Sequence, residues 1–371
     1  MDRCQQKRPY LLLLQLGRNQ DKMDFGHTLD VCQQQFKHYS RILANKKENS
    51  SPLYLKLSRG IVLDRDLLEL ASIGCDPNLF FGSVHFLLLK GKNHGLRRFY
   101  AGFGSRTDKG DPLPAFRSFC LQHRPELENL MRNRSVQTNE AGRCAVLYPA
   151  FQIVSDIGQG KPLALVDLGA SAGLSLLWDY YAYDYGSVGF YGSKNAAVRV
   201  SCNLRGHAIP HLSSAFPPVS SRIGVDLSPV NLRMSDSALW LRALVWPEHR
   251  NRASVLERAI EVARNHPPKL IKGDIVKLLP RIVDEMPPEC APCIFCSFTF
   301  RQLPTASCRA LFSIMRSHST GTQLSFILLD SFGKDFATLY LIVFRNNRMS
   351  QPIRLGRCDL HGAWLRWSHQ R

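Results

Sequence analysis

The stretch LALVDLGASAGLSLLW, residues Leu163–Trp178, decides how the rest of this chain is interpreted. An apolar run ends in Asp167, a turn carries Gly169 and Gly173, and an amphipathic segment follows. This order predicts a buried parallel strand that leads into a helix through a turn of small residues. Open α/β sheets bind nucleotide-like ligands at such turns. The same turn also spells G-x-S-x-G, the nucleophile elbow of serine hydrolases, so two interpretations stay open at this point.

The composition is that of an ordinary globular protein. The chain has 371 residues, of which 44% are hydrophobic and 21% charged, and this length allows two domains and a large core. The longest early apolar run, residues 11–14, is far shorter than the roughly 18 residues that a membrane-spanning helix needs. We therefore expect a cytoplasmic protein without a membrane anchor, although a cleaved presequence stays open.

The chain is strongly basic, with a formal net charge of +18 at pH 7. Such an excess attracts anions, including nucleic acid. The sequence shows no basic run interleaved with aromatic residues and no signature of an RNA-binding module. A nucleic-acid partner is therefore compatible with the charge but has no motif to support it. The sequence gives no indication of the oligomeric state.

Eleven cysteines are scattered along the chain without a regular spacing, which is typical of reduced thiols. Three of them, Cys290, Cys293 and Cys296, are close enough in sequence to raise the question of a metal site. Their apolar segment is predicted to be a strand, in which residues three apart point to opposite faces. We therefore expect buried thiols here and no metal.

Two patterns divide the chain into expected domains. Residues 1–155 are predicted to form a helical N-terminal cap domain. Residues 156–371 alternate apolar strands with helical segments, which is typical of a Rossmann-like, doubly wound parallel sheet and makes the fold class α/β. The strands are expected at residues 163–168, 222–227, 269–273, 292–298, 324–329 and 340–344. A stretch at about 183–219, rich in Gly, Ser, Pro and Tyr, predicts an inserted hairpin or flap.

Acidic residues close three successive predicted strands. Asp226 is placed to accept both hydroxyls of a ribose, as acids at that position do in nucleotide-binding folds. Asp167 would order the turn or accept from a ligand amino group, and Asp274, after Gly273, would accept from an adenine amino group. Each acid alone could equally cap a helix or a turn. Three in succession favour a ligand site at one edge of the sheet.

With these acids and glycines in this order, the region resembles class I S-adenosylmethionine-dependent methyltransferases. The resemblance implies S-adenosylmethionine as cofactor and methyl transfer to an acceptor, a small molecule or a macromolecule, beneath the helical domain. It implies that the cofactor is bound by Asp167, Gly169, Ser171, Gly173, Asp226 and Asp274. There are two departures from the pattern. Ser171 replaces the middle glycine, and the gap to Asp226 is longer than usual.

A second resemblance covers nearly the whole chain. The domain-of-unknown-function family numbered 2332, mostly bacterial and regarded as methyltransferase-like, is similar in the segments Arg134–Phe151, Leu165–Asp179, Ile223–Val230, Leu239–Arg252 and Asp359–Trp367. It implies a fold but no reaction. It also draws attention to Asn139, Glu140 and Arg143, which would contact substrate at the cofactor edge or serve equally well as a cap and turn. The segment CIFCSFTFRQLP departs from the family at the fourth strand.

The catalytic residue is not identified, because methyl transfer needs mainly an aligned nucleophile and a dry site. Glu140 and His361 are the candidates, with a structural role in a C-terminal strand as the alternative for His361. The hydrolase interpretation would use Ser171, Asp330 and His361 in the chain order of that fold. The sequence has no Gly-rich oxyanion segment before the strand, and the hydrolase interpretation gives Asp226 no role. A catalytically degenerate binding protein is the third hypothesis.

Overall fold

The computed structural model describes residues 29–46, 50–104 and 107–369, and these residues form two compact units. The sheet-containing unit comprises residues 139–232 and 258–369, and the helical unit comprises the described residues up to 138 together with 233–257. Across the described ranges, no helix is both long and apolar enough to cross a membrane. The apolar run at residues 11–14 lies outside the described residues.

The helical unit is built around a helix that is buried on nearly every side. In α5 (Pro77–Leu89), the cap residue Asp76 accepts from two backbone N–H groups, and proline occupies the first helical position. Phe81 of α5 stacks on Tyr54 with ring centroids 4.2 Å apart. The surrounding helices are α2 (Leu29–Asn45), α3 (Pro52–Ile61), α4 (Arg65–Ala71), α6 (Leu113–Gln122), α7 (Arg124–Asn133) and α9 (Ser235–Ala243), with the 3-10 helix η2 (Gly95–Phe99).

The predicted domain boundary after residue 155 differs from the division in the structure. Helix α8 (Cys144–Ile157) belongs to the sheet-containing unit, whose first described segment begins at Asn139, while residues 233–257 return to the helical unit. The reason lies in the apolar surface of α8, where Phe151 packs on Phe295 of the sheet with centroids 5.3 Å apart. A helical pattern in the sequence does not reveal which core a helix joins.

The main sheet has the order β5-β13-β12-β10-β9-β8-β1-β6-β7, with β11 paired to β10. Five neighbouring strands form a parallel group, in the order β7, β6, β1, β8 and β9. The sheet continues from β9 with antiparallel pairing through β10, β12 and β13. The strands are β1 (Leu163–Leu168), β5 (Asn203–Leu204), β6 (Val219–Asp226), β7 (Lys269–Lys272), β8 (Ala291–Ser297), β9 (Leu324–Asp330), β10 (Ala337–Arg345), β11 (Arg348–Met349), β12 (Ile353–Cys358) and β13 (Trp364–Trp367). The α/β class and a mostly parallel central portion are therefore confirmed.

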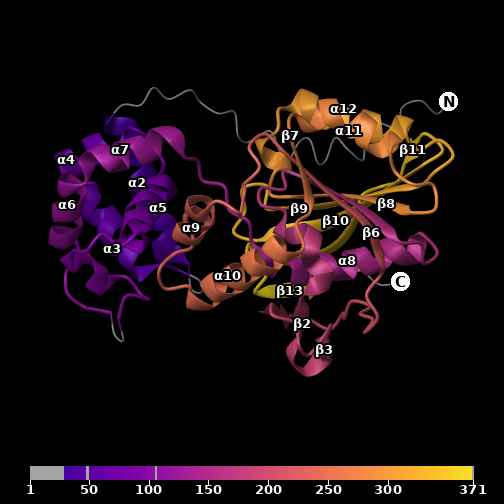
Figure 1. The fold of residues 1–371 in the computed structure, drawn as a ribbon, viewed down its shortest axis with the longest axis horizontal. Coiled ribbons are helices and arrows are strands. Elements are labelled where there is room, and N and C mark those ends of the chain that lie inside the picture. The colour runs from indigo at the N-terminus through magenta and orange to yellow at the C-terminus, as the bar shows by residue number, and fades with distance from the viewer. Residues whose placement is uncertain (1–28, 47–49, 105–106, 370–371) are drawn as a thin grey trace. The chain divides into compact units, whose positions relative to one another are not determined.

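Helices cover both faces of this sheet (Figure 1). Helices α11 (Ile275–Asp284) and α12 (Thr305–Ser317) share one apolar core with Ile294 and Cys296 of β8, and α8 lies on the other face against Phe295. Helix α10 (Arg250–Asn265) precedes β7. Because neighbouring residues of a strand alternate in direction, Cys293 lies on the face of Phe295, opposite Cys296. Both thiols are buried, as expected, and they point away from each other.

The connection from β1 to β6 differs from the prediction in its helix and agrees with it in its inserted hairpin. The amphipathic helix expected after β1 is a kinked 3-10 helix, η4 (Leu174–Tyr180), which is broken by the non-helical backbone of Leu177 and whose first five residues are all buried. The expected hairpin is formed by β2 (Ala182–Asp184) and β3 (Phe190–Tyr191), which pair antiparallel around η5 (Gly186–Val188). Strand β4 (Arg199–Ser201) joins them to make a packed three-stranded sheet. Tyr183 stacks on Tyr148 of α8 at 5.1 Å, which fixes the insertion to the sheet unit.

Candidate functional site

The turn after β1 lies where the order of the parallel strands reverses. Strands β6 and β7 extend the sheet on one side of β1, and β8 and β9 extend it on the other. In sheets of this kind ligands bind outside the carboxyl ends of the strands at such a reversal. The residues of a ligand site are therefore expected to lie together at this carboxyl edge.

The two glycines of the turn are required by close packing. Gly169 and Gly173 have φ values of +86° and +76°, in the region that favours glycine. A Cβ on Gly169 would lie 2.6 Å from the Cβ of Thr299, and one on Gly173 would lie 2.7 Å from the Cγ of Pro268. The backbone N–H of Gly169 donates to the carbonyl of Val225 at 2.8 Å. The glycines thus bring neighbouring segments close to the turn, and the Thr299 side chain occupies the space next to Gly169.

Ser171 occupies the middle of the turn in an unusual conformation. Its φ is +53°, which is uncommon for a residue with a Cβ. Its N–H donates to Oδ2 of Asp226 at 2.9 Å. Its Oγ is buried and has no hydrogen-bond partner within the described part of the chain. A buried polar group of this kind calls for a specific explanation, such as a bound ligand.

Asp226, the last residue of β6, connects two strands at the carboxyl edge. Besides the bond from Ser171, its Oδ1 accepts from the N–H of Ser228 at 2.8 Å. A carboxylate can accept about four hydrogen bonds in all, and a ribose hydroxyl is one kind of donor that it binds. Asp226 therefore lies at the end of β6, next to the turn after β1.

Asp167 lies beside this carboxylate and is 2% exposed. Burial raises the pKa of Asp167 from 3.8 to about 8, the negative charge of Asp226 adds to the rise, and Arg143 opposes it. At neutral pH the group is therefore mostly a neutral carboxylic acid, able to donate one hydrogen bond.

Asp274, the third predicted acid, caps a helix. Its Oδ1 accepts from the N–H groups of Val276 and Lys277 at 2.7 and 3.2 Å, at the start of α11. The side chain is exposed. This is the helix-cap alternative that the sequence left open.

The predicted substrate segment lies on the turn. Oδ1 of Asn139 accepts from the N–H of Leu174 at 2.8 Å, and its Nδ2 donates to the carbonyl of Ala170 at 3.3 Å. Glu140 is 7% exposed, and its Oε1 lies 3.7 Å from Nδ1 of His361. The structure therefore brings the two catalytic candidates side by side, although they are separated by 221 positions in the numbering.

A close backbone approach makes this pairing possible. A Cβ on Gly142, in the 3-10 helix η3 (Ala141–Arg143), would lie 2.5 Å from the carbonyl oxygen of His361. His361 belongs to the turn between β12 and β13, which Asp359 orders by accepting from the N–H of His361 at 2.8 Å. Since β12 runs in the same direction as β9, this turn also lies at the carboxyl edge.

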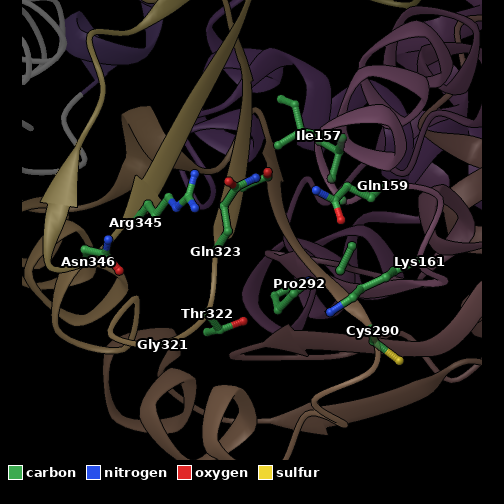
Figure 2. Close-up of a pocket in the computed structure, with 14 residues that line it drawn as sticks. Ile157, Gln159, Lys161, Cys290, Pro292, Gly321, Thr322, Gln323, Arg345 and Asn346 are labelled. Carbon is green, nitrogen blue, oxygen red and sulfur yellow. The ribbon is translucent and has the colours of Figure 1, made fainter.

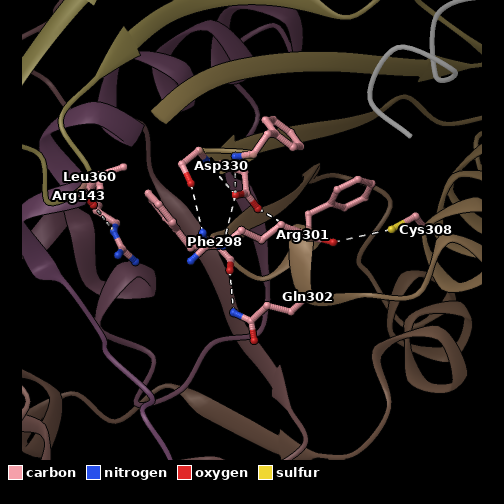
Figure 3. A network of polar contacts seen from close by, with 10 residues as sticks. Arg143, Phe298, Arg301, Gln302, Cys308, Asp330 and Leu360 are labelled. Atoms are coloured by element: carbon pink, nitrogen blue, oxygen red, sulfur yellow. Dashed lines mark hydrogen bonds and ion pairs between the residues drawn. The ribbon is translucent and has the colours of Figure 1, made fainter. Parts of the chain in front are cut away.

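Arginine and aromatic side chains form a second part of the edge (Figure 3). Arg143 donates through Nε to the carbonyl of Leu360 at 2.9 Å, and its guanidinium lies 4.0 Å from the ring centroid of Phe298. A second guanidinium, that of Arg301 in η6 (Phe300–Gln302), lies 5.6 Å from the same ring. Both distances are within the range of cation–π attraction.

Asp330 anchors the loop that carries this ring. Its Oδ2 accepts from the N–H of Arg301 at 3.1 Å, and its Oδ1 accepts from that of Ser331 at 2.7 Å. Burial raises the pKa of Asp330, and the bonds with Arg301 oppose the rise. No sequence motif identifies Phe298, Thr299 or Arg301 as site residues. The rule that ligands bind at the carboxyl ends of strands would have drawn attention to them, since they directly follow β8.

The hydrolase interpretation requires Ser171, His361 and Asp330 to form a triad. The structure separates them. Ser171 Oγ has no partner among the residues described, the Asp330 carboxylate accepts from backbone N–H groups, and His361 pairs with Glu140. The geometry therefore offers no activated serine.

The comparisons with known proteins agree with the resemblance to a family of unknown function. Residues 36–367 match the family described as an uncharacterized protein conserved in bacteria, DUF2332. No curated protein and no solved structure matches the chain. Because the match covers nearly the full length, the chain belongs to the DUF2332 family.

Proposed function

We propose that this protein is an S-adenosylmethionine-dependent methyltransferase with a Rossmann-like sheet. The observation that carries the proposal is the Asp226 carboxylate, which ends β6 and accepts from the N–H of Ser171 in the turn after β1. An acid in this place binds ribose hydroxyls in nucleotide-binding folds.

The strand order supports the same proposal. The parallel part of the sheet has the order β7-β6-β1-β8-β9. If these five strands are counted by their order along the chain, they lie in the order third, second, first, fourth, fifth. That is the order of doubly wound nucleotide-binding sheets up to the fifth strand. The antiparallel continuation through β10 and β12 and the 3-10 helix after β1 are particular to this chain.

The residues at the edge fit the nucleoside part of the cofactor. Asp226 would accept from the ribose hydroxyls, and the Ser171 hydroxyl, buried and without a partner among the described residues, would bond the ligand. Asp167, held neutral by burial, would donate or accept one hydrogen bond without adding a charge. When bound, S-adenosylmethionine would supply an activated methyl group.

The acceptor side of the site would be formed by the segment that carries the substrate candidates. Asn139 is a positioning residue, because both polar ends of its side chain bond the turn. The Glu140–His361 pair, 3.7 Å apart, would hold the proton that an acceptor releases. Arg143 and the ring of Phe298 would orient an acceptor beside them.

One observation favours a second candidate function, a binding protein of the same fold that transfers nothing. The Thr299 side chain packs against Gly169, where methyltransferase-like turns leave the backbone open to a ligand. This packing narrows the space on the β8 side of the turn.

Calorimetric titration with S-adenosylmethionine and S-adenosylhomocysteine tests the proposal. We expect binding of at least one ligand and a loss of tenfold or more in affinity for Asp226→Ala, since lost hydrogen bonds to a charged group contribute about 1.5–3 kcal/mol. Asp284→Ala, an exposed acid at the end of α11, is the matched control and should bind as the wild type does. No heat with either ligand, or unchanged affinity in Asp226→Ala, would refute the proposal.

A second measurement separates the transferase from the binding protein. The protein is incubated with methyl-labelled S-adenosylmethionine and a bacterial cell extract. Label transferred to any extract component by the wild type and not by Asp226→Ala supports a transferase. Binding without such transfer supports the second candidate.

A further inference from the structure

A polar cavity lies at the amino edge of the sheet, at the opposite end of the strands from the proposed cofactor site (Figure 2). Its volume is about 330 Å³. It is lined by the end of α8 and the residues after it, the start of β8, the segment before β9 and the end of β10. The floor is fixed by close packing, because a Cβ on Gly158 would lie 2.7 Å from the Cβ of Ala291.

The charge of the lining has one sign. Among the described residues around the cavity, Lys161 and Arg345 are cationic and no acidic side chain is present. Figure 2 shows the two side chains extending toward the cavity from different sides. The ammonium of Lys161 lies 3.5 Å from the carbonyl of Pro288, at the outer limit of a hydrogen bond. Arg345 is the last residue of β10, and it is exposed.

Neutral donors and apolar groups complete the lining. Gln159, Gln323 and Asn346 contribute amides, and Thr322 contributes a hydroxyl. Amides and hydroxyls donate hydrogen bonds to anion oxygens. Ala291 and Pro292 give the cavity an apolar floor that suits an organic body. The volume of about 330 Å³ is at the lower end of the range of small-molecule sites.

We propose that this cavity binds a small organic anion, a phosphate or carboxylate compound, through Lys161 and Arg345. The site is distinct from the proposed cofactor site and goes beyond the proposed function. The guanidinium of Arg345 would bind the anion through two parallel hydrogen bonds, and Lys161 would add a point charge from the facing side.

A structural role explains only one of the two cations. Lys161 follows the C-terminus of α8, where a positive charge is favourable to the helix dipole. Arg345 ends a strand, so no helix dipole accounts for it. Two cations from separate elements facing one acid-free cavity are better explained by an anionic ligand.

Calorimetry with pyrophosphate, succinate and neutral glycerol tests the inference, using the full chain at low ionic strength. We expect one of the two anions to bind and glycerol not to bind, and the preferred anion identifies the headgroup. Lys161→Gln and Arg345→Gln should each weaken binding at least tenfold, and Arg348→Gln, a cation of the same hairpin that does not line the cavity, should change it less than twofold.

Three results would overturn the inference. The first is the absence of binding heat with both anions. The second is a loss of anion affinity in Arg348→Gln as large as that in the two cavity variants, which would indicate general attraction to a basic surface. The third is unchanged anion affinity in Lys161→Gln or Arg345→Gln when thermal denaturation of the same samples shows that these variants are folded. Titrating Arg345→Gln with S-adenosylmethionine keeps the two proposals separate, because this variant should retain cofactor affinity.

Discussion

Replacing Asp167 by asparagine should remove a pH dependence from the stability of the sheet-containing unit. Asp167 is 2% exposed, and burial, with Asp226, raises its pKa from 3.8 to about 8, against the opposing effect of Arg143. The native protein therefore holds a proton that the unfolded chain releases above pH 4. Asparagine has nearly the same shape as the protonated acid and does not titrate.

The sign of the effect follows from proton linkage. Between the unfolded pKa near 4 and the folded pKa near 8, the native state binds more protons than the unfolded state, so the free energy of unfolding falls as the pH rises. The slope for one fully shifted group is about 1.4 kcal/mol per pH unit. From pH 5 to pH 7 this group should therefore lower wild-type stability by roughly 3 kcal/mol.

Urea unfolding at pH 5, 6, 7 and 8, followed by tryptophan fluorescence and circular dichroism, measures this difference. We expect Asp167→Asn to be more stable than the wild type at neutral pH, with the advantage shrinking at pH 5. Asp335→Asn, the same replacement at an exposed acid, should leave the pH dependence unchanged. Parallel pH profiles for wild type and Asp167→Asn would show that Asp167 ionises normally, and the burial argument would then be wrong.

Three further predictions concern stability and use the same unfolding measurement. Asp274→Ala should lower the free energy of unfolding by about 1 kcal/mol, because the carboxylate caps α11 by accepting from two backbone N–H groups. An unchanged free energy of unfolding would contradict the cap assignment. Gly169→Ala should lower the free energy of unfolding by about 2–3 kcal/mol, because φ is positive and the added Cβ would lie 2.6 Å from the Cβ of Thr299. Adding Thr299→Ala to this variant should restore part of the lost stability. Tyr54→Phe should be neutral or stabilising by about 1 kcal/mol, because the buried hydroxyl has no partner among the described residues, whereas clear destabilisation would indicate a bound water.

The strands could be predicted well because their signals are local. The predicted limits of β1 agree with the observed Leu163–Leu168, since six buried residues bounded by a proline before and a glycine turn after define a central parallel strand. The segment at β8 was predicted one residue late at each end and is observed as Ala291–Ser297. The position of Asp226 at the carboxyl edge followed from the same reasoning, since parallel strands end at one edge.

The contacts that complete the candidate site depend on distant parts of the chain. The pairing of Glu140 with His361 rests on the backbone approach at Gly142, and no local pattern predicts an approach between segments so far apart. Phe298 has a left-handed φ of +63°, which residue propensities do not predict because bulky residues disfavour positive φ. The regular helix predicted after β1 is instead the kinked 3-10 helix η4, and no local pattern in the sequence predicts its break at Leu177.

The loop after β8 determines from which side a ligand reaches the turn. Thr299 packs on Gly169, and its loop is held by the N–H of Phe298, which donates to the carbonyl of Leu329 at 2.9 Å, and by the N–H of Arg301 on the buried Asp330. Moving Thr299 away would break bonds to a buried carboxylate, and leaving such a group unpaired costs on the order of 1–3 kcal/mol. A ligand should therefore approach from the β6 side, over Ser171 and Asp226, and variants of these two residues should affect binding more than variants of Thr299.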